Sequence, residues 1–168
     1  WNDPTYPANP DATEKALRLW DALWNEGYRI CGIGGSDVHN NPEDSYAPGG
    51  PPSVIGDPAT YVLADGLSAS RILEAVRAGR AYVSRGPVLE PEVRIGDRSY
   101  PPGSDLTEAI RASGGEPLQF RLAAECGGPA VVRWIENGKE AMRMRIEGGG
   151  VCAGSARWNP DAHRWGRW

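Results

Sequence analysis

Asp37 and His39 are the two side chains whose types and spacing could do chemistry in this sequence. They stand two residues apart in Gly34-Gly-Ser-Asp-Val-His39, directly after a short apolar run. In an extended backbone, residues i and i+2 point to the same side. A carboxylate and an imidazole that converge in this way are suitable ligands for zinc, manganese or iron. The spacing therefore predicts that Asp37 and His39 bind one divalent metal ion or part of a metal pair.

The same two residues also have a plain structural interpretation. Asp37 could cap a turn, and His39 could be a solvated surface residue. Short motifs of this kind occur by chance, so spacing alone leaves both interpretations open.

The surrounding sequence resembles a known family. Gly34-Gly-Ser-Asp-Val-His39 is similar to the last metal-binding motif of the PHP (polymerase and histidinol phosphatase) superfamily. The downstream segments Gly56-Asp-Pro-Ala-Thr-Tyr-Val62 and Leu67–Pro87 follow in the order found in the CehA/McbA-like subgroup of PHP metallohydrolases. The resemblance covers roughly residues 1 to 90.

This resemblance implies a metal-dependent hydrolase, with a phosphoester or another ester as substrate and manganese, zinc or iron as cofactor. PHP enzymes gather several histidines and carboxylates along a βα barrel, beginning with a His-x-His near the N-terminus, whereas this chain has two histidines in total. The chain also begins at Trp1 without a methionine. We therefore expect it to be the C-terminal portion of an enzyme, with most metal ligands in a missing N-terminal half. Alone it is expected to be inactive and to bind possibly no metal.

The first part of the chain, residues 1–86, predicts α/β structure. Asp11 and Gly27 are suited to begin and end a helix whose apolar face, with Trp20 and Trp24, packs on a sheet. Strands are predicted over 28–34, 60–64 and 80–84, with a helix from Ser68 to Gly79 between the last two. Strand, helix and strand with short connections are typical of a parallel βα unit. The expected fold is thus the C-terminal part of a PHP-type βα barrel, with Asp37 and His39 just past a strand end.

The second part, residues 87–168, predicts a different architecture. Short segments at 92–95, 118–122, 131–135 and 142–146 largely alternate apolar and polar residues. The turn signals between them are Pro101-Pro-Gly103, Gly127-Gly-Pro129, Asn137-Gly138 and Gly148-Gly-Gly150. Asn137-Gly138 is a strong hairpin signal. We expect a small antiparallel, sandwich-like β domain here.

Other polar residues keep two interpretations. Arg85, past a predicted strand end, could bind an anionic substrate or be an ordinary surface cation. Glu43, Asp44 and Tyr46 lie in a Pro- and Gly-rich loop that could form a wall of a substrate pocket or be solvated. His163 has no partner at ligand spacing and is expected at the surface.

Composition narrows the partners. The net charge of −4 provides no basic surface for nucleic acid, and no apolar run approaches the length of a membrane span. Three cysteines without metal-ligand spacing favour a reducing compartment, the cytoplasm. A sheet edge left open by missing strands would favour a homodimer.

A second hypothesis belongs to another class of function. The chain could be a non-catalytic structural or binding module whose β-rich half docks a partner, a glycan or the rest of its own polypeptide. The number of metal ligands separates the two, because a catalytic cluster needs more than Asp37 and His39.

Overall fold

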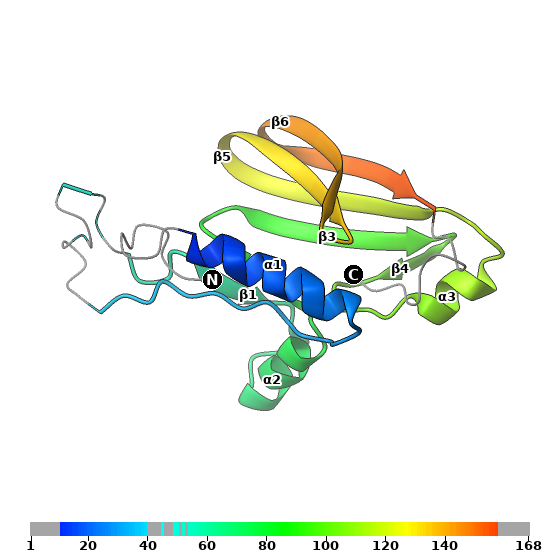
Figure 1. Ribbon diagram of the computed structural model, residues 1–168, viewed down its shortest axis with the longest axis horizontal. Coiled ribbons are helices and arrows are strands. Elements are labelled where there is room, and N and C mark those ends of the chain that lie inside the picture. Colours follow the sequence, from blue (N-terminus) through cyan, green and yellow to red (C-terminus); the bar gives the residue numbers. More distant parts are fainter. Residues whose placement is uncertain (1–10, 40–44, 46–48, 51, 53, 158–168) are drawn as a thin grey trace.

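The computed structural model describes residues 11–39, 45, 49–50, 52 and 54–157. Two antiparallel sheets make up most of this part (Figure 1). The smaller sheet pairs β1 (Ala59–Val62) with β2 (Ala81–Ser84), and the larger has the strand order β4-β3-β5-β6. Helices α1 (Ala12–Asn25), α2 (Ala69–Arg77) and α3 (Thr107–Ala112) are short. None of the helices in the described residues is long and apolar enough to cross a membrane.

The prediction of a parallel βα unit is wrong. β1 and β2 pair antiparallel, with Ala59 opposite Ser84 and Val62 opposite Ala81. The pairing continues beyond the strands, because the Leu63 amide donates to the Arg80 carbonyl at 2.9 Å. α2 is therefore an insertion in a hairpin, and Figure 1 shows it projecting away from the strands. The described residues contain no α/β barrel.

The reversal that produces this hairpin is encoded at the end of α2. The Gly79 amide donates to the Val76 carbonyl and the Arg80 amide to the Ala75 carbonyl, the paired bonds that close a helix at a left-handed glycine. Gly79 has a φ of 77°. The helix ends as predicted, but the chain then turns straight back beside β1. At the other end the Ser68 hydroxyl accepts from the Arg71 amide, which confirms the predicted N-cap.

The predicted strand at 28–34 is also wrong. Its backbone groups bond to side chains instead of a neighbouring strand. The indole nitrogens of Trp20 and Trp24 both donate to the Ile30 carbonyl, at 2.7 and 2.9 Å. The two rings meet edge to face, with centroids 5.7 Å apart. The tryptophans are therefore fixed against this segment, and α1 has no fully buried residue, contrary to the predicted packing of the helix on a sheet.

The larger sheet contains all of the strands predicted after residue 87. They are β3 (Val88–Ile95), β4 (Arg98–Tyr100), β5 (Leu118–Glu136) and β6 (Lys139–Ala156), all antiparallel. Asn137 and Gly138 form a two-residue turn with φ angles of 50° and 74° between Glu136 and Lys139, so the hairpin prediction is confirmed.

The expected sandwich of two sheets is replaced by one hairpin that folds back on itself. The register of β5 against β6 shifts between Glu125 and Pro129, where the glycine-rich segments 127–128 and 148–150 lie. These glycines bend the strands instead of ending them, and Figure 1 shows β5 and β6 curling over β3. The rings of Phe120 and Trp134, far apart on β5, come within 4.0 Å of each other.

Hydrophobic burial is concentrated in this second region. One cluster joins β3, β5 and α3, and a second lies inside the folded hairpin. The first is formed by Val93, Ile95, Leu106, Ile110 and Leu118, and the second by Ala124, Ile146 and Cys152. In residues 11–86, Ala75 is the only buried hydrophobic residue that the structure describes.

Candidate functional site

Asp37 and His39 lie together, as the sequence predicts. The Oδ1 atom of Asp37 is 3.0 Å from Nε2 of His39, and both side chains are exposed, 54% and 77% respectively. The geometry that joins them is not the extended one, because Asp37 has a φ of 53° in the left-handed region. Aspartate tolerates this conformation better than most residues. The pair is formed by a local turn at Asp37.

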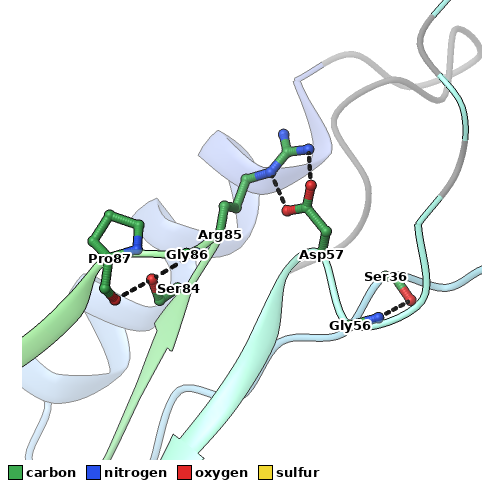
Figure 2. Close-up of polar contacts among 7 residues, drawn as sticks. All are labelled: Ser36, Gly56, Asp57, Ser84, Arg85, Gly86 and Pro87. Atoms are coloured by element: carbon green, nitrogen blue, oxygen red, sulfur yellow. Dashed lines mark hydrogen bonds and ion pairs between the residues drawn. The ribbon is translucent and has the colours of Figure 1, made fainter. Parts of the chain in front are cut away.

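Two polar contacts hold the segment that carries this pair. The Gly34 amide donates to Oγ1 of Thr60 at 2.9 Å, and the same hydroxyl donates to the Gly34 carbonyl at 2.7 Å. One side chain of β1 thus satisfies both backbone groups of one residue, as a neighbouring strand would. Two residues later the buried Ser36 hydroxyl accepts from the Gly56 amide at 3.4 Å (Figure 2). The turn at Asp37 is therefore anchored to the smaller sheet.

A second ionic pair lies on the same side of the smaller sheet. Arg85 follows β2 and Asp57 precedes β1, and the antiparallel pairing brings these two ends together. The guanidinium binds the carboxylate through two bonds, Nε to Oδ1 at 2.5 Å and Nη2 to Oδ2 at 2.9 Å. Figure 2 shows the Asp57 carboxylate turned toward Arg85 and away from Ser36. The hydrogen bond from Arg85 lowers the pKa of Asp57 below its usual value.

This pair changes the interpretation of Arg85. Its guanidinium meets a carboxylate of its own chain, so its charge is largely compensated, and anion binding at Arg85 would have to compete with Asp57. Sequence reasoning missed Asp57. Antiparallel pairing of the two strands was the signal that would have placed it beside Arg85.

Ser84 sits next to this pair and is structural. Its buried hydroxyl donates to the Pro87 carbonyl at 2.6 Å and accepts from the Gly86 amide at 3.2 Å (Figure 2). Both bonds stay within the turn that leads from β2 to β3. With its proton given to a carbonyl and no base beside it, Ser84 is not arranged as a nucleophile.

Asp37 and His39 fit a divalent metal by the chemistry of their donors but not by their number. A carboxylate oxygen and an imidazole nitrogen 3.0 Å apart can bind one cation, and both atoms are accessible. Within residues 11–39, 45, 49–50, 52 and 54–157, however, no group of three or more His, Cys, Asp or Glu side chains could hold a metal ion. Glu43, Asp44, Tyr46 and His163 lie outside the described residues.

Comparisons with known proteins give no relative from which a function could be transferred. No protein-family model matches the chain, and no curated protein and no solved structure matches it significantly. The site must therefore be interpreted from its own residues.

Proposed function

We propose that Asp37 and His39 are two ligands of a divalent metal ion, manganese, zinc or iron, in a metal-dependent hydrolase. The observation that carries the proposal is the 3.0 Å approach of Asp37 Oδ1 to His39 Nε2 on an exposed, anchored turn. The class of reaction, hydrolysis of a phosphoester or another ester, rests on the resemblance of Gly34–His39 to a metallohydrolase motif. It no longer draws support from a barrel fold.

The roles of the chain's own residues follow from the geometry. Asp37 and His39 would hold the cation, and the Ser36–Gly56 and Gly34–Thr60 bonds would keep the two donor atoms in place. When bound, such a metal activates water and neutralises negative charge on the substrate. Further ligands have to come from residues outside the described part or from another polypeptide. We therefore propose that the catalytic protein is larger than the site seen here, that this chain alone is inactive, and that a missing N-terminal half completes it.

Metal content tests the proposal directly. The purified chain is incubated with manganese or zinc, separated from free metal, and measured by mass spectrometry. We expect binding in the wild type, and loss of about tenfold in affinity in His39→Ala and Asp37→Ala because each removes one of few ligands. His163→Ala is the matched control, as it removes the other histidine of the chain.

The outcomes separate the possibilities. Metal bound equally by wild type and His39→Ala would contradict the assignment of the ligands. Metal-dependent phosphatase activity in the isolated chain, abolished by Asp37→Ala, would show that the chain is catalytic by itself and would exclude a purely structural role.

A second candidate function has its own support. Helix α1 has no buried residue, and Leu19, Ile33, Ile55 and Leu67 are 61%, 62%, 76% and 98% exposed. Apolar surface of this kind is typical of a part that docks onto other protein. The docking part would then be residues 11–86, whereas sequence reasoning assigned docking to the β-rich half. A binding module of this kind would bind no metal, so the same measurement separates the two functions.

The compartment is the least supported element of the proposal. We propose the cytoplasm, because Cys31, Cys126 and Cys152 are all free thiols.

A further inference from the structure

A pocket away from Asp37 and His39 lies where the ends of α1 and α2 meet the loop after β4. It encloses about 280 Å³ and is lined by Trp24, Arg29, Ile30, Cys31, Arg77, Ala78, Gly79 and Gly103. That volume is near the lower end of small-molecule sites. The lining combines two guanidinium groups with an indole and a thiol, and it contains no acidic side chain.

The walls of the pocket are held in place by contacts outside the ligand space. Nη2 of Arg29 donates to the Gly103 carbonyl at 2.8 Å, and the Trp24 indole nitrogen donates to the Ile30 carbonyl at 2.9 Å. Gly79 and Gly103 touch backbone to backbone, since a Cβ added to Gly103 would lie 1.8 Å from the Ala78 carbonyl oxygen. These contacts join three segments that are distant in sequence. The pocket is thus formed by the fold, not by one flexible loop.

The charge in the pocket is uncompensated. Among the residues that the structure describes, neither Arg29 nor Arg77 forms an ion pair with a carboxylate, whereas Arg80 and Arg85 close by do. The C-terminus of α2 contributes a partial negative charge of roughly half a unit, far less than two guanidinium charges. The carbonyls of Ala75 and Val76 at that end are already bonded to amides. A bound anion would offset the remaining positive charge.

We propose that this pocket binds a small organic anion through its carboxylate or phosphate group, with Arg29 and Arg77 contacting the oxyanion and Trp24 the apolar body. Guanidinium groups match the planar, bidentate geometry of such oxyanions. Both arginines are exposed, so affinity is expected to be modest, with a dissociation constant on the order of 1 mM. The site is independent of the proposed metal ligands.

Two probes distinguish the source of the anion: benzoate for an aromatic carboxylate and inorganic phosphate for a free phosphate. Binding is measured by calorimetry and by the rate at which iodoacetamide alkylates Cys31, followed by peptide mass spectrometry. Burial raises the pKa of the Cys31 thiol, and a ligand in the pocket should slow its alkylation several-fold further. Cys126 and Cys152 lie elsewhere and provide internal references.

The variants are chosen to remove charge while keeping polar contacts. Arg29→Gln and Arg77→Gln should each weaken binding about tenfold and abolish the protection of Cys31. Arg71→Gln is the matched control, because Arg71 is on the same helix, bonds a backbone carbonyl and does not line the pocket. It should change binding less than twofold.

Saturable binding of either probe with this pattern supports the proposal and identifies the preferred head group. Absence of saturable binding for both probes, or binding that Arg29→Gln and Arg77→Gln leave unchanged, would overturn it. Circular dichroism on each variant confirms that the fold is retained.

Discussion

Residues 11–86 and residues 88–157 differ in what their hydrophobic side chains touch. In the second region Val93 is completely buried, and Leu106 and Cys152 are 2% and 3% exposed. In the first, most of the large hydrophobic side chains are exposed, and polar contacts such as Asp57–Arg85 and Thr60–Gly34 hold the segments together. Burial of apolar area is the dominant source of stability. The second region should therefore form the stable core of this chain.

The comparison has a functional side. The proposed metal ligands and the anion pocket both lie in the region with little core, at turns and element ends. Functional segments are commonly taken from the less stable part of a protein, because they have to open, close or accept a partner. A region that depends on polar anchors can also be stabilised by what it binds.

The largest expected difference comes from one substitution made in each region. Ile95→Ala removes a side chain that is 6% exposed in the core of the larger sheet, and Ile33→Ala removes one that is 62% exposed. We expect a loss of about 3 kcal/mol in the first case and less than about 0.5 kcal/mol in the second, measured by urea denaturation. Equal losses would break the comparison, because they would show that Ile33 is covered in solution by a second copy.

The contact between the two regions gives the next largest effect. Gly103, with a φ of 81°, presses on Ala78 and Gly79, whereas Gly114, with a φ of 67°, has open space where a Cβ would lie. Alanine costs about 1 kcal/mol at either position because of its left-handed backbone. At Gly103 steric overlap adds about 1–3 kcal/mol.

Thermal and urea denaturation of Gly103→Ala and Gly114→Ala would therefore measure how firmly the regions are joined. A much larger loss for Gly103→Ala, with faster alkylation of Cys31, is the expected result. If the two variants lose equal stability, the regions are not pressed together at this point.

Local signals in the sequence were sufficient for individual elements. Ser68 and Gly79 bound α2, and Asn137-Gly138 makes the hairpin turn, because each acts through the backbone of its own neighbours. The proximity of Asp37 and His39 is also local, although a left-handed turn produces it.

Strand pairing was not predictable in the same way. Whether β1 and β2 run parallel or antiparallel depends on where the chain goes after α2, which the apolar pattern does not encode. The family resemblance favoured the parallel choice, and it was wrong. The segment 28–34 has the composition of a strand, but the Trp20 and Trp24 indoles take the Ile30 carbonyl. Asp57 and the pocket at Arg29 and Arg77 were missed because both depend on contacts between segments distant in sequence.

The smallest expected effect concerns the polar anchor next to the candidate site. Asp57→Asn removes the charge that binds Arg85 through two hydrogen bonds. The side chains of Arg85 and Asp57 are 44% and 34% exposed, so solvent screening limits the loss to about 0.5–1 kcal/mol. Glu108→Gln is the control, since it removes a carboxylate from an exposed pair within one helix, with Arg111.

The pH dependence of that loss separates a charge effect from a packing effect. Arg85 lowers the pKa of Asp57 below 3.8, so the folded protein holds this proton less tightly than the unfolded chain. The stabilisation is then complete above about pH 4 and disappears as the pH falls through the lowered pKa. Wild type and Asp57→Asn should differ in urea denaturation at pH 7 and converge near pH 2. A difference that persists at low pH would mean that Asp57 acts through its shape. In that case the first region would depend less on ionic anchors than its contacts indicate.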